Sequence, residues 1–413
     1  MFKKIATLLL CASSLFALTL EEAISTALKK SPTLKMQSAK SDISKESKRA
    51  KKGEFFGSLD FVGSYNSYNI PRTLAPIVPP ITPGTVSSKD IASAGLKYDV
   101  ILFSGFAQLR DIDIAELGKK LSDTEFKLSK EELVYNIKSL FYKTLALKDR
   151  RVSALSYEKA LKRLYDDVER EVEFGKKAPV DLLKVESDLE EAKFNIVNID
   201  SSIETLKAKL ASLMGVESVG ELEGETQTNG LEEIAAIEST YLYKKGMLEV
   251  KKSEKGVGKA KALYFPKAAL SAYYGSNYGA GESEELWQVG VNFSFSIFDF
   301  GKRDAEYQKA LIAKQIARLK LENTKLLLKS EIADAKNSIV SAEAKLSSTL
   351  RQLRFLKKIT EAERVKYEKG ASDIYDLLYA EAKLSRAESS LAEARYDLLA
   401  ARAYLKYLTA GER

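Results

Sequence analysis

The sequence predicts an α+β membrane protein in which one structural plan occurs twice along the chain. Three observations support this fold class: an internal repeat, a change in the spacing of apolar residues within each copy, and two very long segments without proline. The repeat indicates duplication. The change of spacing indicates strands followed by helices, and the missing prolines allow those helices to continue unbroken.

The internal repeat appears when the sequence is laid over itself at a shift of 195 residues. Residues 174–183 then fall on 369–378, so that a glycine meets a glycine and Asp-Leu-Leu meets Asp-Leu-Leu. Self-similarity at a fixed shift is typical of repeated supersecondary units. We therefore assign a first repeat to 18–214, an equatorial linker to 215–230 and a second repeat to 231–413.

The first residues predict export. Lys3 and Lys4 precede an apolar run that ends before Ala17, so residues 1–17 are interpreted as a signal peptide. The single cysteine, Cys11, lies in that run and follows Leu10, which is larger than the small residue that a lipoprotein cleavage site requires. We interpret Cys11 as one of the apolar residues of the signal peptide and not as a lipid attachment site. The mature protein would then hold neither a disulfide nor a thiol site.

Composition excludes several classes of function. Histidine is absent, and neither a glycine-rich phosphate loop nor a cysteine cluster occurs, so we expect no cofactor, no metal site and no enzyme activity. A formal charge of +7 spread over a chain with 30% charged residues does not indicate nucleic-acid binding. No apolar stretch reaches the roughly 18 residues of a spanning helix. A membrane crossing would therefore require a closed β-barrel.

Each repeat begins its main part with a predicted β-hairpin. Apolar and polar residues alternate most clearly over 285–300, and the equivalent strand of the first repeat lies at about 90–103. Weaker partners precede them at about 55–68 and 264–278. The first hairpin loop, 69–89, holds five of the eight prolines. The apolar face of the clearest strand consists of Trp287, Val289, Val291, Phe293 and Phe295.

Strands of this length with aromatic residues on one face are typical of outer-membrane barrels. The sequence alone also permits an ordinary sheet that covers a soluble core. The leader and the repeat favour contact with lipid, so we interpret the five apolar residues of 285–300 as lipid-facing.

A very long helix follows each hairpin, at about 105–174 and 301–369. At about 1.5 Å per residue each would reach roughly 100 Å. Apolar residues fall at coiled-coil spacings in both, which predicts lateral packing against neighbouring helices. Return helices at 180–214 and 374–408 are about half as long. Residues 20–51 and 231–261 are also helical in pattern. We expect them to stack end to end with the return helices, so that the long helices are covered along their whole length.

Three sequence motifs carry a resemblance to a known family. They are Leu-Thr-Leu-Glu-Glu-Ala-Ile-Ser-Thr-Ala-Leu at 18–28 followed by Ser31-Pro32, Ile-Phe-Asp-Phe-Gly-Lys-Arg at 297–303, and Lys-Gly-Ala-Ser-Asp-Ile-Tyr-Asp-Leu-Leu at 369–378. In this order of elements the chain resembles the TolC family of outer-membrane efflux proteins over essentially its whole mature length. The resemblance implies a channel and not an enzyme.

The resemblance further implies a homotrimer with a shared twelve-stranded β-barrel, four strands from each chain, continued by a long periplasmic α-helical barrel. The expected location is the outer membrane, in contact with its lipid and with a large periplasmic extension. The expected function is the exit duct of a tripartite efflux or type I secretion system. Its partners would be a periplasmic adaptor (membrane fusion) protein and an inner-membrane pump. A shared barrel is also expected on physical grounds, because four strands alone would leave two unpaired edges in lipid.

The family resemblance places the periplasmic mouth at the two helix hairpins. The residues that match the adaptor-contacting tips are Gly175, Lys176, Lys177, Gly370, Ala371 and Ser372. Each glycine also has a purely structural explanation, since glycine commonly ends a helix. Both explanations can hold together.

In the second hairpin, Asp376 matches an aspartate at the pore constriction of the family, and Asp373 is a further candidate for the same acidic ring. Such rings favour cations. The alternative for Asp376 is a helix N-cap or a first-turn acid, which is the role we expect for Asp181 in the first hairpin. Tyr379 stands where some family members have a second acid.

A different class of protein also remains open from sequence. An exported periplasmic coiled-coil adaptor or tethering protein would share the leader, the helices and the charge. It would have no reason for a strand with five apolar residues on one face, so the strand pairs discriminate between the two functions.

Overall fold

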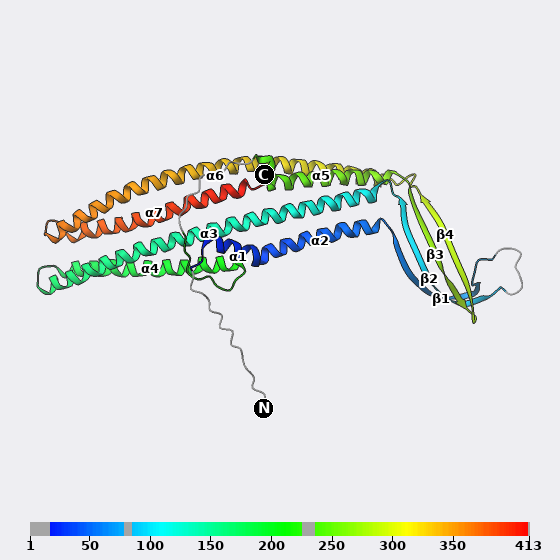
Figure 1. The fold of residues 1–413 in the computed structure, drawn as a ribbon, viewed down its shortest axis with the longest axis horizontal. Coiled ribbons are helices and arrows are strands. Elements are labelled where there is room, and N and C mark those ends of the chain that lie inside the picture. Colours follow the sequence, from blue (N-terminus) through cyan, green and yellow to red (C-terminus); the bar gives the residue numbers. More distant parts are fainter. Residues whose placement is uncertain (1–16, 78–84, 225–235, 412–413) are drawn as a thin grey trace, which may run out of the picture. The chain divides into compact units, whose positions relative to one another are not determined.

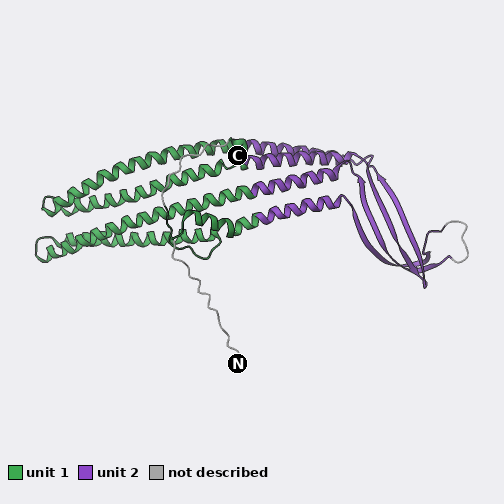
Figure 2. Cartoon of the chain, viewed as in Figure 1, with its two compact units in different colours: residues 1–37, 126–241, 326–413 green, residues 38–125, 242–325 purple. Residues whose placement is uncertain are grey.

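The computed structural model describes residues 17–77, 85–224 and 236–411. Nearly all of the predicted signal peptide, part of the proline-rich loop and part of the linker lie outside these ranges. The chain forms two compact units (Figure 2). Unit 1 comprises Met1–Gln37, Phe126–Tyr241 and Leu326–Arg413, and unit 2 comprises Ser38–Glu125 and Leu242–Lys325. Each unit draws on both sequence repeats, so the repeats are not separate compact bodies.

Over the described ranges the chain is mostly helical with one four-stranded sheet, which confirms the coarse fold class (Figure 1). The first half contains α1 (Leu20–Lys30), α2 (Pro32–Glu54), β1 (Ser58–Thr73), β2 (Ser87–Phe103), α3 (Ala107–Glu173) and α4 (Pro179–Met214). The second half contains the short 3-10 turns η1 (Ile237–Ser239) and η2 (Ala262–Tyr264) on either side of α5 (Tyr241–Lys261), then β3 (Lys267–Gly279), β4 (Glu282–Ser294), α6 (Lys302–Glu368) and α7 (Ile374–Leu408). Among the described residues, no helix is both long and apolar enough to span a membrane.

The sheet in unit 2 has the antiparallel order β1-β2-β3-β4 and presents one apolar face. Its register aligns Phe61 with Leu96, Leu96 with Tyr274, and Tyr274 with Trp287 across all four strands. Successive residues of a strand point to opposite faces, so this row lies on one side. The side chains of Phe61 and Trp287 are 75% and 71% exposed. The chain therefore leaves an aromatic sheet face uncovered.

Strand β4 is shorter than predicted. The prediction extended to residue 300, whereas the strand ends at Ser294 and Phe295 lies beyond it. The backbone leaves the strand because a turn forms ahead of α6. In that turn the Arg303 amide donates to Asp299 Oδ2 at 3.1 Å, and the Arg303 guanidinium pairs with the same carboxylate at 2.8 Å. Phe295 is thus an exposed residue after the strand and not part of it.

The first hairpin also differs from its prediction, because the strands enter the region assigned to the loop. β1 continues to Thr73 and β2 begins at Ser87, where the sequence predicted a loop over 69–89. The register shifts between Ser67 and Arg72, so an irregularity accommodates Pro71. An edge strand tolerates proline because one side of its backbone pairs with no neighbour.

The predicted helix over 20–51 is two helices. Ser31 has an extended backbone (φ −53°, ψ 122°) and precedes Pro32, which disfavours helical geometry in the residue before it. Gly215 packs against this break. A Cβ on Gly215 would lie 2.7 Å from the Lys30 carbonyl oxygen and 2.9 Å from Pro32 Cδ, so only glycine fits.

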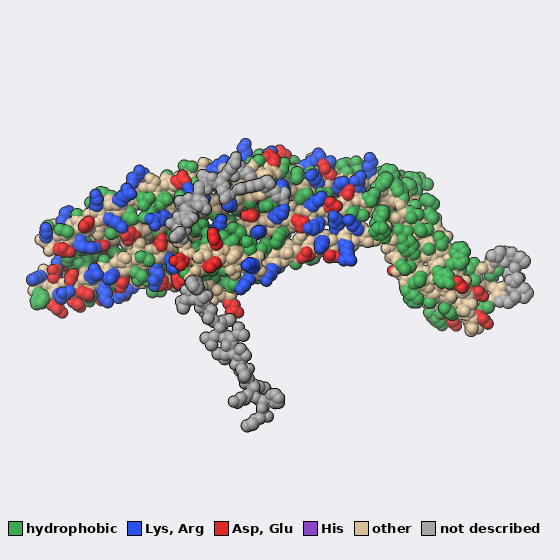
Figure 3. Space-filling model, in the orientation of Figure 1, with side chains coloured by type: hydrophobic (Ala, Val, Ile, Leu, Met, Phe, Trp, Pro, Cys, Tyr) green, Lys and Arg blue, Asp and Glu red, His purple; other side chains and the backbone are tan. Residues whose placement is uncertain are grey.

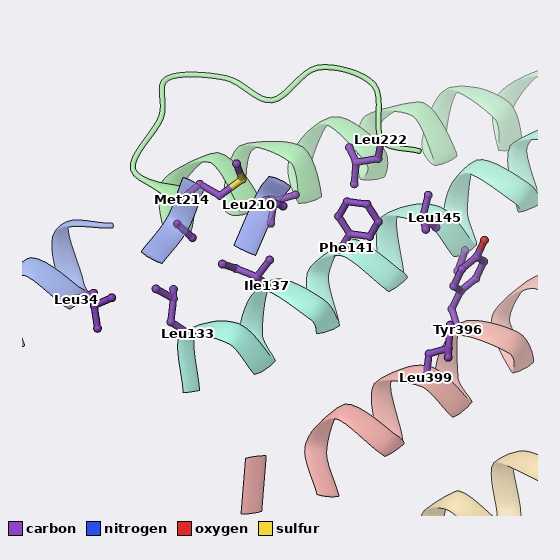
Figure 4. Packing of buried hydrophobic residues seen from close by; sticks show 13 residues of the cluster. Leu34, Leu133, Ile137, Phe141, Leu145, Leu210, Met214, Leu222, Tyr396 and Leu399 are labelled. Atoms are coloured by element: carbon purple, nitrogen blue, oxygen red, sulfur yellow. The ribbon is translucent and has the colours of Figure 1, made fainter. Parts of the chain in front are cut away.

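The core of unit 1 forms where α3 packs against α1 and α4 (Figure 4). Ile137 and Phe141 are fully buried in it, together with Leu210 from α4. Their spacing along α3 is that of the coiled-coil pattern seen in the sequence. The corresponding apolar residues of α6 behave differently, since Ile312, Ile316, Leu319 and Leu326 are all exposed. One long helix therefore buries its apolar stripe within the chain, and the other leaves part of its stripe open.

Candidate functional site

The candidate site is the pair of helix hairpins in unit 1. We call the α3–α4 connection, residues 174–181, tip 1 and the α6–α7 connection, residues 369–376, tip 2. The two long helices end with the same backbone motif. Gly175 and Gly370 adopt left-handed φ angles of 68° and 70°. The amides that follow them, of Lys176 and Ala371, each donate to a carbonyl five residues earlier at 2.8 Å.

This arrangement is the Schellman motif, which satisfies the last carbonyls of a helix and favours glycine at the left-handed position. A Cβ added to either glycine would meet nothing within 4 Å. The backbone angle, and not a lack of space, therefore requires glycine within the chain. The space beside both glycines is open to a binding partner.

The return helices begin differently at the two tips. At tip 2, Asp373 is the N-cap, and its carboxylate accepts a hydrogen bond from the Asp376 amide at 3.0 Å. At tip 1, the N-cap is Ala178, which has no side chain to accept a bond, and Pro179 begins α4. Asp181 and Asp376 occupy equivalent first-turn positions, where the helix dipole stabilises a negative charge. Asp181 and Asp376 are therefore first-turn acids, one of the two structural roles considered for them, and the N-cap of tip 2 is Asp373.

Ser372 is engaged within tip 2. Its hydroxyl oxygen lies 3.1 Å from Glu363 Oε2 and 3.3 Å from Asp376 Oδ2, so one hydroxyl serves both carboxylates. Lys366 pairs with Glu363 at 2.6 Å, and this pair, with help from the Ser372 hydrogen bond, lowers the pKa of Glu363. The Ser372 side chain thus links α6 to α7, whereas the methyl side chain of the neighbouring Ala371 has no polar atom.

Lys177 of tip 1 reaches across to the end of α6, just before tip 2. Its ammonium nitrogen lies 4.7 Å from the ring centroid of Tyr367 on α6, which is a cation–π distance. Burial, reinforced by the negative charges of Glu171, Asp167 and Asp181, raises the pKa of Tyr367 to about 12. The ring stays neutral at physiological pH. No local sequence pattern connects a lysine of one repeat with a tyrosine of the other. The contact of Lys177 with Tyr367 therefore could not be predicted from the sequence.

A shared hydrophobic cluster holds the two tips side by side. It combines buried residues of α3, α4 and α7, namely Leu161, Leu164, Val168, Val185, Leu189, Ala192, Ile374, Leu377 and Leu378. Ile374 and Leu377 flank the acids of tip 2 along α7. Because these neighbours are buried, the position of Asp376 at the surface is fixed by packing.

A polar cavity of about 1000 Å³ adjoins Asp376. It is lined by residues of α3, α4 and α7, including Lys184, Asp188, Tyr379 and Arg386. Lys184 pairs with Asp188 at 2.8 Å, so part of its charge is balanced within the cavity wall. No group of three or more candidate metal ligands occurs among the residues that the structure describes. One chain thus supplies exposed carboxylates at this site but not a complete ion cage.

The strand residues predicted to face lipid lie on the open face of the sheet. Trp287, Val289, Val291 and Phe293 share one side of β4, and all four are exposed. The same face includes Leu59, Phe61 and Tyr65 of β1. The register across the four strands places these residues on the same side of the sheet. Alternation within a single strand predicts which residues share a face of that strand, but not how the strands align.

Comparison with known proteins agrees with this architecture. The family model described as outer membrane efflux protein matches residues 23–216 and 244–411. The chain is 20% identical to the outer membrane protein TolC of Vibrio cholerae serotype O1, covering 94% of this chain and 90% of that protein. It superposes on the outer membrane protein VceC of Vibrio cholerae with a TM-score of 0.81 at 16% identity, over 95% of this chain and 96% of VceC.

The structure of the CmeC outer membrane channel of Campylobacter jejuni is similar to the same degree. Its TM-score is 0.82 at 16% identity, over 95% of this chain and 85% of CmeC. At such identities the structures establish a shared fold. The family model includes both tips and most of both repeats, and it leaves out residues 1–22, 217–243 and 412–413. The chain belongs to the outer membrane efflux protein family.

Proposed function

We propose that the protein is the outer-membrane exit duct of a tripartite efflux or type I secretion system, and that it works as a homotrimer. The observation that carries this proposal is the exposed aromatic face of a sheet whose outer strands, β1 and β4, each pair on one side only. A four-stranded sheet with two open edges is unstable in lipid, whereas three copies can close into a twelve-stranded barrel. Membrane insertion would then require trimerisation.

The exposed stripe of α6 supports the same assembly. Ile312, Ile316 and Leu319 follow one another at helical spacing and remain uncovered by the chain. A head-to-tail ring buries such a stripe against the next subunit. In this arrangement the helices of three chains continue the barrel as a periplasmic tunnel.

The polar face of the sheet would line the duct. Lys97 and Asp99 on that face form an ion pair at 2.8 Å. Where this face meets the helices of unit 2, a cavity of about 1040 Å³ is lined by residues such as Asp99, Ile101 and Ala269. A polar inner face and an apolar outer face are what a barrel enclosing water in a bilayer requires.

The two tips would form the periplasmic mouth, where tip 2 contributes Asp376 and Asp373 to an acidic ring built from three chains. Such a ring attracts cations and can bind divalent ions through the summed field of its carboxylates. The open space beside Gly175 and Gly370 would receive the hairpin of a periplasmic adaptor, which connects the duct to an inner-membrane pump. Lys176 and Ala371 are the neighbouring tip residues left for this contact, since Lys177 and Ser372 have partners within the chain.

An adaptor or tethering protein is the less favourable explanation. The family to which the chain belongs consists of outer-membrane efflux proteins and not of enzymes or adaptors. A tether in water would also gain nothing from aromatic residues on an uncovered sheet face, because an exposed apolar patch of this kind promotes association.

Val289→Lys tests the membrane placement, with Gln288→Lys as the matched control on the opposite face of β4. A lysine on the lipid face costs about 2–4 kcal/mol at the bilayer midplane, whereas one in the lumen is tolerated. We expect Val289→Lys to abolish the heat-sensitive trimer in outer-membrane fractions and Gln288→Lys to retain it. A purified protein that stays monomeric and soluble without detergent would refute the proposal.

A further inference from the structure

The junction between the sheet and the helices of unit 2 exposes a dense set of aromatic side chains. They lie in the short segments that connect each helix to its strand. The exposed rings are Phe55, Phe56, Phe106, Tyr264, Phe265, Phe298 and Phe300. Contiguous apolar surface of this kind marks contact with another molecule or with a membrane.

Two of these phenylalanines hold a strained backbone. Phe106 and Phe300 have φ angles of 68° and 53°, and each lies next to a glycine that is also left-handed. A residue with a Cβ loses stability in this conformation. The Phe300 side chain is 91% exposed, so packing within the chain does little to offset the strain. A contact with another molecule would offset this strain.

Positive charge gathers on the helices beside this junction. Helix α2 holds seven Lys and Arg residues against three acids, and α5 holds seven lysines against two glutamates. The opposite end of the sheet is acidic, since β4 begins with three glutamates within four residues and holds no basic residue. Figure 3 shows the Lys and Arg side chains over these helices, next to the hydrophobic surface of the junction and sheet. Arg72 of β1 and Lys89 of β2 lie at the acidic end too, but Asp90 and the three glutamates outnumber them, so the excess of basic residues is at the helix end of the sheet.

Three exposed lysines stand at the helix ends nearest the sheet. Lys52 lies in the last turn of α2, Lys261 ends α5, and Lys302 begins α6. None of the three forms an ion pair with a residue that the structure describes. Lysines further along the same layer are often paired, as Lys48 is with Glu116 at 3.3 Å. Arg303 lies over the Tyr264 ring at 5.5 Å but is paired with Asp299. Lys52, Lys261 and Lys302 are thus the charges at the helix ends that remain available to an anion.

We propose that this junction binds the phosphate groups of anionic phospholipids in the periplasmic leaflet of the outer membrane. We name the headgroup belt by its members Lys52, Lys261, Lys302, Phe106 and Phe300. The rings would lie at the boundary between headgroups and acyl chains, as interfacial aromatic residues do. The lysines would neutralise the phosphates just outside that boundary. The inference rests on the proposed membrane placement of the sheet.

Lipid competition on a reporter at the junction, next to the headgroup belt, tests the proposal. The chain has a single tryptophan, so Trp287→Phe combined with Phe56→Trp places the only indole at the junction. The trimer would be reconstituted in vesicles containing brominated phosphatidylglycerol or brominated phosphatidylcholine, and quenching would give the relative binding of the two lipids. We expect a preference for phosphatidylglycerol of about threefold or more, because clustered lysines attract anionic lipid.

The triple variant K52Q/K261Q/K302Q should bring this preference close to one, and K52R/K261R/K302R should restore it. The matched control is K40Q/K251Q/K320Q, which removes exposed lysines from the same three helices at least ten residues further from the sheet. That distance is about 15 Å or more along a helix, beyond the screening length of about 8–10 Å, so the control should retain the preference.

Equal quenching by the two lipids in the unaltered belt, or an equal loss in the control triple, would overturn the inference. Salt gives a measurement that needs no belt variant, since 0.5 M NaCl should reduce the preference if it is electrostatic. Failure of the membrane placement itself would look different. Neither brominated lipid would then quench the reporter, because the junction would not touch the bilayer.

Discussion

The two hairpin tips end their long helices in the same way and begin their return helices in different ways. Gly175 and Gly370 have nearly the same left-handed angle and the same pair of closing hydrogen bonds. After the turn, tip 2 has the carboxylate cap of Asp373, whereas tip 1 has Ala178 followed by Pro179. Duplication has thus preserved the turn, and the two copies differ in charge and capping just beyond it.

This difference separates the residues that reverse the chain from the residues proposed to face ions at the periplasmic mouth. Both tips require glycine in order to reverse the chain. Tip 2 has two carboxylates at the start of α7, the N-cap Asp373 and the first-turn Asp376, where tip 1 has only the first-turn Asp181. The second repeat is therefore the better candidate for the ion-facing side of the duct, and the shared glycines are the better candidates for a partner contact common to both tips.

The largest expected effect comes from filling the open space beside a tip glycine. Gly370→Trp should abolish efflux, because the indole would occupy the space proposed for the adaptor, while the left-handed backbone costs only about 1–2 kcal/mol of local strain. Drug resistance of a complemented deletion strain measures the loss, and unheated gels of the outer membrane check that the trimer persists.

Gly281→Trp is the matched control for strain. Gly281 lies in the β3–β4 turn with φ +83° and nothing within 4 Å of its added Cβ, so it carries the same backbone penalty away from the tips. Retained resistance in Gly281→Trp and lost resistance in Gly370→Trp would separate partner contact from strain. Normal resistance in the Gly370→Trp strain would exclude an adaptor contact at this glycine.

The next effect, a change of severalfold, concerns the first-turn acids of the two tips. Asp376→Asn should raise conductance, lower cation selectivity and weaken divalent-cation block in planar bilayers, because a trimer would lose three charges from one ring. Asp181→Asn changes the equivalent position of tip 1 and should leave these properties nearly unchanged.

The double variant Asp373→Asn/Asp376→Asn tests whether the carboxylate of the N-cap, Asp373, also contributes to the acidic ring. A further loss of selectivity would include it, and no further loss would restrict the ring to Asp376. If Asp181→Asn and Asp376→Asn changed selectivity equally, the two tips would share the mouth and the assignment to tip 2 would be wrong.

Sequence periodicity predicted the mixture of long helices and four strands because burial and alternation leave a direct trace in residue order. Leu133 and Ile137 fall on the buried stripe of α3 that their spacing predicts. Alternation predicts too late an end for β4, because Phe295 continues the pattern while Asp299 and Arg303 form a turn that alternation does not encode. The break at Ser31 has a local cause in the sequence, since Pro32 disfavours helical geometry in the residue before it.

The tips were harder to predict in detail. The aligned repeat located both glycines, but the capping bond from the Asp376 amide to Asp373 depends on backbone angles that spacing alone leaves open. The contact of Lys177 with Tyr367 joins two repeats through tertiary packing, which no local pattern records. The roles proposed for Asp376, Asp373 and the tip residues at the mouth stay predictions, since they depend on partner chains.

The smallest effect tests the capping difference directly. Asp373→Ala should destabilise the start of α7 by about 1 kcal/mol, the usual value of an N-cap, whereas Asp373→Ser keeps an oxygen in the same place. Ala178 at tip 1 already has the extended backbone of an N-cap (φ −78°, ψ 143°), so Ala178→Ser should stabilise the start of α4 by a similar or smaller amount. Amide hydrogen exchange measures both, with about fivefold faster exchange at the Asp376 amide in Asp373→Ala. Unchanged exchange there would mean that the hydrophobic cluster around Ile374 and Leu377, and not the carboxylate, holds the first turn in place.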